Sequence, residues 1–172
     1  SVRYAMGNPE RVNGLVLLSA SGAPRKKEDS PPMALRLMKN PFGRFLIKRI
    51  WSRNMAKSSL EDMVFDESSI TEEEVDRLWD FSTYPGNMDA MFREFANSWE
   101  DFNPTEIRGI ATNTLLIWGE EDSICPESMG SWYDSHLPNS ALVVLPNIGH
   151  NPHFECPGRC LDEISSWIGT LS

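Results

Sequence analysis

The stretch that decides the fold runs from residue 115 to residue 150 and reads LLIWGEED, then SICPESMGSWYDSHLPNS, then ALVVLPNIGH. It begins and ends with an apolar run typical of a buried strand, and the polar segment between them is long enough for a helix with its two loops. Parallel strands need such a crossover, and the crossover is nearly always right-handed. The stretch therefore predicts a βαβ unit that contains two neighbouring parallel strands.

Each of these two strands is followed by a residue that can do chemistry. Asp122 follows the first strand and His150 follows the second, 28 positions later (150 − 122). Parallel strands present their carboxyl ends at one edge of the sheet, where open α/β sheets bind ligands, so we expect the carboxylate and the imidazole to meet there. An acid paired with a base supplies two members of an acid–base–nucleophile relay.

In these residues the chain resembles the α/β-hydrolase superfamily. In that family the aspartate orients the histidine, and the histidine activates a nucleophile on a strand-to-helix elbow, so the resemblance implies these roles for Asp122 and His150. Glu120 and Glu121 occupy variable positions of the motif and are weaker candidates for the acid. The matching features are Trp118-Gly119-x-x-Asp122 with Pro126 four residues on, and Leu145-Pro146-Asn147-x-Gly149-His150 followed by Glu155.

The start of the chain matches the part of the family that follows the nucleophile elbow. Residues 1–7 have the character of a helix end, and residues 11–19 contain a buried strand centred on Leu15-Val16-Leu17-Leu18. The elbow motif G-x-S-x-G occurs nowhere in the 172 residues, and Ser1 falls on the helix after the elbow, so we do not assign it as the nucleophile. The resemblance implies an α/β fold: the C-terminal strands of an α/β-hydrolase parallel sheet with an inserted helical lid.

In the family, the strand at residues 15–18 pairs with the elbow strand. An unpaired strand edge exposes N–H and C=O groups and invites another chain to pair with it. We therefore expect the N-terminal half of the same protein, or a second copy of this chain, to cover that edge. We also expect residues 1–172 alone to show no hydrolysis, because the oxyanion-hole donors of the family lie after the nucleophile and in an earlier loop.

Residues 24–105 differ in character from the rest of the chain. After a proline-rich polar segment they show helical patterns at 33–39, 42–53 and 58–64, with no strand pattern between them. Thr71 caps a further helix that ends before Pro85-Gly86, and Asn87 caps the next one. The predicted domain organisation is a discontinuous α/β core, residues 1–23 and 106–172, with residues 24–105 as the helical lid.

Apolar side chains of the predicted lid are candidates for contact with a substrate. Stripes of this kind belong to a protein core more often than to a binding wall, but the resemblance implies that one face of the lid looks onto the active site. The stripe of the last lid helix runs through Met88, Met91, Phe92, Phe95 and Trp99 at helical spacing. The substrate-binding candidates are Trp79, Met91, Phe92 and Phe95.

The composition excludes several classes of function. A net charge of −9 argues against a nucleic-acid groove and against attraction to anionic membranes. No apolar run is long enough to span a membrane. Three cysteines are too few for a disulfide framework and favour a reducing compartment, so we expect a cytoplasmic protein.

A zinc site is the main alternative use of the C-terminal motif, His150-x-x-His153-x-x-Cys156-x-x-x-Cys160. Two observations disfavour it. Cys160 fits the apolar stripe of the last helix, and a structural zinc ion would consume the histidine best placed for catalysis. We expect that stripe to pack inward, and its members are Cys160, Leu161, Ile164, Trp167 and Ile168. We expect no metal and no cofactor.

These features together predict acyl transfer to water, with a small apolar ester-like substrate. Carbon–carbon bond hydrolases of the meta-cleavage type share the layout, but they have tryptophan where this chain has Asn151, and their lid arginine lies beside the position of Arg77. Haloalkane dehalogenases and epoxide hydrolases use an aspartate nucleophile outside this chain. A non-enzymatic ligand-binding or receptor module with the same fold is the alternative from another class, and the elbow sequence distinguishes it from an enzyme.

Overall fold

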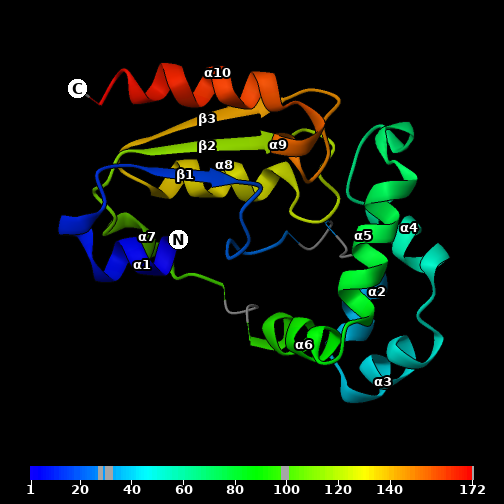
Figure 1. Ribbon diagram of the computed structural model, residues 1–172. Coiled ribbons are helices and arrows are strands. Elements are labelled where there is room, and N and C mark those ends of the chain that lie inside the picture. Colours follow the sequence, from blue (N-terminus) through cyan, green and yellow to red (C-terminus); the bar gives the residue numbers. More distant parts are fainter. Residues whose placement is uncertain (27–28, 30–32, 98–100, 172) are drawn as a thin grey trace.

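A three-stranded parallel sheet forms the centre of the described structure (Figure 1). The computed structural model describes residues 1–26, 29, 33–97 and 101–171. The strands are β1 (Leu15–Leu18), β2 (Thr114–Gly119) and β3 (Ser140–Leu145), in the order β1-β2-β3. The predicted α/β fold class is confirmed, and all three strands lie where the apolar runs predicted them.

The central strand is buried along its whole length. All six residues of β2 are buried, which parallel sheets require because helices cover both of their faces. Leu116 pairs with Leu17 on one side and with Leu142 on the other. The outer edge of β1 has no neighbouring strand among the described residues, so the chain expected to cover that edge stays a prediction.

Alternate side chains of the strands face two separate apolar layers. Leu17 and Trp118 face helices α1 (Val2–Gly7), α7 (Pro104–Arg108) and α8 (Glu127–His136). Leu115 and Ile117 face helix α10 (Pro157–Ile168). Figure 1 shows α8 and α10 on opposite faces of the sheet.

The last helix buries fewer residues than the sequence predicted. Cys160 is buried, and Ile164 and Trp167 pack beside it. Leu161 is 64% exposed and Ile168 is also exposed, so the prediction that these two face inward is wrong. Successive residues of a helix lie about 100° apart, so a stripe through Cys160, Ile164 and Trp167 turns Leu161 away from the sheet.

A helical insertion, residues 33–97, joins β1 to the later strands and lies beyond their carboxyl ends (Figure 1). No helix of the described residues is both long enough and apolar enough to cross a membrane. The division of the chain into a core and a lid stays a prediction. The helices of the insertion are α2 (Met33–Met38), α3 (Pro41–Ile50), α4 (Arg53–Glu61), the short 3-10 helix η2 (Glu67–Ser69), α5 (Glu72–Thr83) and α6 (Asn87–Asn97).

Local capping decides where the helices of the insertion begin and end. Thr71 forms the predicted cap of α5: its Oγ1 accepts a hydrogen bond from the Glu74 N–H, and the Glu74 carboxylate accepts one from the Thr71 N–H. The helix expected at 42–53 is wrong at its end. Ser52 Oγ accepts from the Met55 N–H at 3.3 Å and starts a new helix, so Arg53 belongs to α4.

The face assignment predicts different results for two leucines, one in β2 and one in α10. Leu116→Ala should lower the free energy of unfolding by about 2 to 5 kcal/mol, since it empties a site in the buried central strand. Leu161→Ala should change it by less than about 0.5 kcal/mol, because that side chain is mostly in solvent. Urea denaturation of the two variants measures both values. Equal losses would contradict the assignment.

Candidate active site

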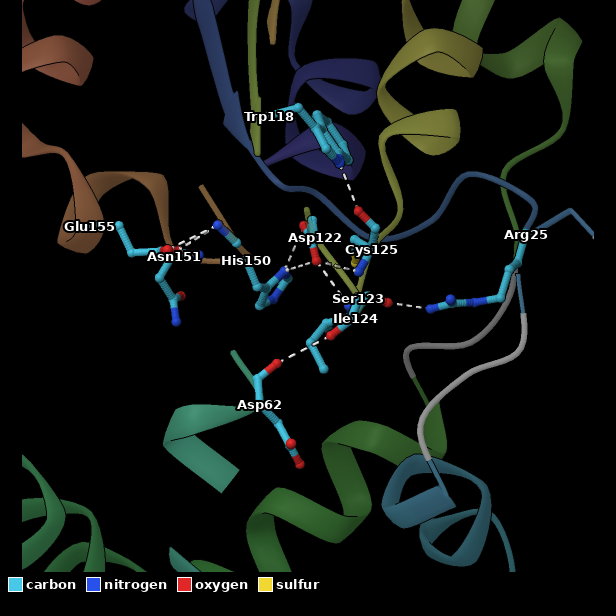
Figure 2. A network of polar contacts seen from close by, with 11 residues as sticks. Arg25, Asp62, Trp118, Asp122, Ser123, Ile124, Cys125, His150, Asn151 and Glu155 are labelled. Atoms are coloured by element: carbon cyan, nitrogen blue, oxygen red, sulfur yellow. Dashed lines mark hydrogen bonds and ion pairs between the residues drawn. The ribbon is translucent and has the colours of Figure 1, made fainter. Parts of the chain in front are cut away.

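Asp122 and His150 meet at the carboxyl edge of the sheet (Figure 2). His150 Nδ1 lies 2.9 Å from Asp122 Oδ2 and 3.1 Å from Oδ1. A carboxylate accepts hydrogen bonds and does not donate them, so Nδ1 is the donor of this contact, and in the neutral ring the lone pair then lies on Nε2. The Asp122 side chain is 0% exposed while that of His150 is 23% exposed, so the base remains accessible beside a buried acid.

The turn after β2 holds the aspartate in place. Asp122 Oδ1 accepts hydrogen bonds from the N–H groups of Ile124 at 2.9 Å and Cys125 at 2.8 Å. This is the local side-chain-to-backbone bonding that makes aspartate a favoured turn residue. The side chains of Glu120 and Glu121 are exposed, and Asp122 is the carboxylate of this turn that contacts His150.

Two residues allow the loop after β3 to reach the loop after β2. Asn147 adopts φ 57°, a left-handed conformation that asparagine tolerates better than most residues. Gly119 lies so close to this loop that a Cβ there would collide with the carbonyl oxygens of Ile148 and Gly149. The Glu121 N–H then donates to the Ile148 carbonyl at 3.0 Å, which ties the two loops together.

The segment after α4, which we call the anchor segment (Asp62–Phe65), is bonded to both loops. The His150 N–H donates to the Met63 carbonyl at 2.8 Å. Ser123 Oγ, next to the catalytic aspartate candidate, donates to the Asp62 carbonyl at 3.1 Å (Figure 2). The helical insertion is therefore fastened to the same loops that carry the acid and the base.

Gly149 makes the close approach of the anchor segment possible. A Cβ at this position would lie 2.8 to 2.9 Å from backbone atoms of Met63, Val64 and Phe65. Backbone atoms cannot rotate away as a flexible side chain does, so any larger residue must push the anchor segment off the histidine loop.

Gly149→Ala should therefore destabilise the protein by about 1 to 3 kcal/mol, the usual cost of overpacking. The matched control is Gly158→Ala, because a Cβ on Gly158 meets nothing within 4 Å. In a helix, that control should stabilise by up to about 1 kcal/mol. Thermal or denaturant unfolding compares the two. A Gly149→Ala variant as stable as the control would show that the close contact is absent.

The residues of the helical insertion that were predicted to bind substrate lie in two environments. Trp79 lines a cavity of about 330 Å³ within the helical insertion, and the lining includes no residue of the loops that carry Asp122 and His150. Phe92 is 3% exposed and packs with Ile47 and Met88 in an apolar cluster that Met91 borders. The side chain of Phe95 lies outside the described part of the structure. The structure brings none of the described three to the Asp122–His150 pair, and their binding roles stay predictions.

A smaller cavity, of about 230 Å³, adjoins the histidine loop. It lies where α4 and α5 meet α9 (Pro152–Glu155), and the sequence analysis did not predict it. The sequence offered only one indication of this cavity, namely that Asn151 and His153, which line it, follow His150 closely. The lining residues are Leu60, Val64, Ile70, Glu74, Asn151, His153 and Phe154.

Ser19 is a further feature that the sequence analysis did not predict. It follows β1 at the same carboxyl edge, with φ 44°, and this conformation is strained for a residue other than glycine, asparagine or aspartate. Its buried Oγ has no hydrogen-bond partner among the described residues. The surrounding sequence, Leu18-Ser19-Ala20-Ser21-Gly22, offers small residues and no recognisable pattern.

The thiols of Cys125 and Cys160 are buried. Among the described residues, no group of three or more His, Cys, Asp and Glu side chains is placed to hold a metal ion. Burial, together with the negative charge of Asp122, raises the pKa of the Cys125 thiol to about 12. Burial and the neighbouring Cys156 raise the pKa of Cys160 to about 11. Both thiols stay protonated near neutral pH and are poor nucleophiles.

Comparison with known proteins agrees with this geometry. Residues 1–157 match the family model of the alpha/beta hydrolase fold. The chain belongs to the alpha/beta hydrolase family. The resemblance inferred from the motifs of Asp122 and His150 is thus confirmed at the level of the family.

Individual relatives cover nearly all of this chain. It is 31% identical over 168 residues to an uncharacterized hydrolase, YugF, of Bacillus subtilis (strain 168), covering 98% of this chain and 60% of that protein. It is 25% identical over 160 residues to a 2-hydroxy-6-oxononadienedioate/2-hydroxy-6-oxononatrienedioate hydrolase of Paraburkholderia xenovorans (strain LB400), covering 90% and 53%. This alpha/beta hydrolase chain therefore spans between about half and three fifths of the length of these relatives.

A solved structure shows the same fold. The 2-hydroxy-6-oxo-6-phenylhexa-2,4-dienoate hydrolase (BphD) of Rhodococcus sp. strain RHA1 superposes with a TM-score of 0.81 at 20% identity, covering 96% of this chain and 58% of that one. At this identity the likeness supports the fold, and the reaction has to be argued from the site.

Proposed function

We propose that this chain supplies the acid and the base of a serine-type hydrolase that cleaves small apolar carboxylic esters. Asp122 is the orienting acid and His150 is the general base. The observation that carries the proposal is the hydrogen bond between His150 Nδ1 and the buried Asp122 carboxylate, at 2.9 Å. The nucleophile is proposed to lie outside these 172 residues, which contain no G-x-S-x-G motif.

The arrangement fits the proton transfers of acyl transfer. His150 Nε2 takes the proton of the attacking hydroxyl and later donates it to the leaving group, and Asp122 stabilises the imidazolium that forms between the two steps. The Asp122 carboxylate holds the His150 ring in the Nδ1–H tautomer. Zinc or another cofactor has no part in these steps.

The helical insertion is proposed to act as the lid that selects the substrate. Its position beyond the carboxyl ends of the strands supports this role, and so does its attachment to both catalytic loops (Figure 2). Apolar and aromatic side chains of α3 to α6 favour a substrate with an apolar acyl or alcohol part over a highly charged one.

Carbon–carbon bond hydrolysis is the second candidate, and the relative from Paraburkholderia xenovorans favours it. Two side chains at or beside the positions of the meta-cleavage pattern argue against carbon–carbon bond hydrolysis. Arg77, next to the position of the lid arginine in meta-cleavage enzymes, is 73% exposed and pairs with Glu73 of the same helix at 3.0 Å. Asn151 stands where those enzymes have a tryptophan. We therefore place ester cleavage first.

Substitution of the two relay residues tests the proposal. In a protein that joins this chain to the N-terminal part its relatives carry, His150→Ala should abolish hydrolysis of an aryl ester without unfolding the protein. Asp122→Asn should lower kcat by up to about 10⁴, because it leaves the ring in the wrong tautomer. His136→Ala is the matched control, since His136 lies at the end of α8, and it should retain full activity.

The assay compares an aryl ester with a 2-hydroxy-6-oxo-dienoate. Faster turnover of the dienoate would favour the carbon–carbon reaction and overturn the choice of substrate. Unchanged activity of His150→Ala on both compounds would remove the relay assignment. No turnover of any ester or dienoate by the unsubstituted protein would favour the ligand-binding module.

A further inference from the structure

We propose that Glu155 is a positioning residue, which fixes the backbone on both sides of His150 and joins it to the anchor segment of the helical insertion. The proposal rests on the proposed role of His150 as the base. Glu155 entered the sequence analysis only as part of a motif, and the contacts in the structure give it a physical task.

The Glu155 carboxylate accepts hydrogen bonds from three backbone N–H groups. Oε1 lies 3.0 Å from the Gly149 nitrogen and 3.2 Å from the Asn151 nitrogen. Oε2 lies 2.9 Å from the Gly149 nitrogen and 2.8 Å from the Phe65 nitrogen. Figure 2 shows Glu155 beside Asn151 and the His150 loop. Both oxygens are therefore in use, and charge-assisted bonds of this type are stronger than neutral ones.

The short helix α9 explains how Glu155 reaches this place. Asn151 precedes the helix, Pro152 occupies its first turn, and the Glu155 N–H donates to the Asn151 carbonyl at 2.9 Å. One turn of helix thus folds the Glu155 side chain back towards the N–H groups that flank His150. Capping a four-residue helix accounts for the Gly149 and Asn151 contacts.

The contact with Phe65 goes beyond local capping. Phe65 lies 90 positions away in the chain, in the anchor segment. The neighbouring Met63 carbonyl accepts from the His150 N–H itself. The two hydrogen bonds connect the same pair of segments, so the anchor segment cannot leave Glu155 without also pulling on the backbone of His150.

This coupling bears on catalysis through the position of the imidazole ring. The ring is held by Asp122 at Nδ1 and by its own backbone, and that backbone is fixed by Glu155 and Met63. A misplacement of about 1 Å can cost about 10² in rate. Glu155 does not touch the reacting atoms and acts through His150. Its hydrogen bond to Phe65 also holds the anchor segment of the insertion against the histidine loop.

Glu155→Gln tests whether the Glu155 carboxylate positions the backbone of His150, because glutamine keeps the size of the side chain. Its amide has one accepting oxygen and an NH₂ group that donates, so one of the two oxygen positions now presents a donor to a backbone N–H group. Glutamine therefore loses the contact with Asn151 or the contact with Phe65. The matched control is Glu106→Gln. Glu106 accepts from the Asn103 N–H at 2.9 Å in the cap of α7, and it has no contact with the site in the described structure.

The experiment is nitrogen-15 NMR of the 172-residue chain. In Glu155→Gln, we expect amide hydrogen exchange at Phe65 or at Asn151 to rise by about tenfold or more, the effect of one lost hydrogen bond, while exchange in β2 stays unchanged. Exchange at His150, whose N–H donates to the Met63 carbonyl, should rise with it. The ring nitrogens of His150 should shift from one tautomer towards a mixture of two. A purely structural role would not move the tautomer. Glu106→Gln should leave both readouts as in the wild type.

Either of two results would overturn the proposal. One is a Glu155→Gln chain with unchanged exchange at Phe65 and at Asn151 and an unchanged His150 ring. The other is faster exchange across β2 as well, which would make Glu155 a general stability residue. Neither readout depends on turnover. The activity of His150→Ala tests the relay assignment separately. That assignment can therefore fail while the positioning role of Glu155 holds, and the positioning role can fail while the relay assignment holds.

Discussion

The structure depends on the parallel, in-register pairing of β2 with β3. Gly119 pairs with Leu145, so the two strands end level with each other and both following loops start from the same point of the sheet edge. The absence of a side chain on Gly119 then lets the loops touch. A shift of the register would separate the Asp122 carboxylate from the His150 ring by several ångströms, because each strand residue adds about 3.3 Å.

The helical insertion adds a second constraint to this pair. The guanidinium of Arg25, before the first helix of the insertion, donates to the Ile124 carbonyl, and Ser123 donates to Asp62 after α4. Segments before and within the insertion therefore both hold the loop of the acid, while Met63 holds the loop of the base. Helices proposed to select the substrate and loops proposed to perform the chemistry form one connected body, so substitutions in the anchor segment can alter catalysis without touching the substrate.

Much of this arrangement follows from local rules that a sequence displays. Apolar runs predicted the strands, and Thr71 predicted the start of α5. The order of strand, aspartate, helix, strand and histidine predicted the meeting of Asp122 with His150. Ser52 was overlooked because an amphipathic pattern continued past it, although a serine cap was present.

Other features depend on contacts between distant segments, which periodicity does not encode. Leu161 continues an apolar stripe in the sequence, yet the sheet covers only the neighbouring strip of α10. Phe92 satisfies the pattern of a lid residue, and packing with Ile47 decides that it is buried. The proposed positioning role of Glu155 depends on the N–H of Phe65, 90 positions away. The motif could therefore single out Glu155 as a residue of interest, but it could not predict this role.

The claim on which the account rests is that these residues by themselves preform the Asp122–His150 pair. Proton NMR of the 172-residue chain tests it most directly, because an imidazole Nδ1–H bonded to a buried carboxylate exchanges slowly and resonates far downfield. We predict such a resonance, assigned to His150 by nitrogen-15 labelling, and its loss in Asp122→Ala with the fold retained. A folded chain without this resonance, or with the same resonance in Asp122→Ala, would contradict the account.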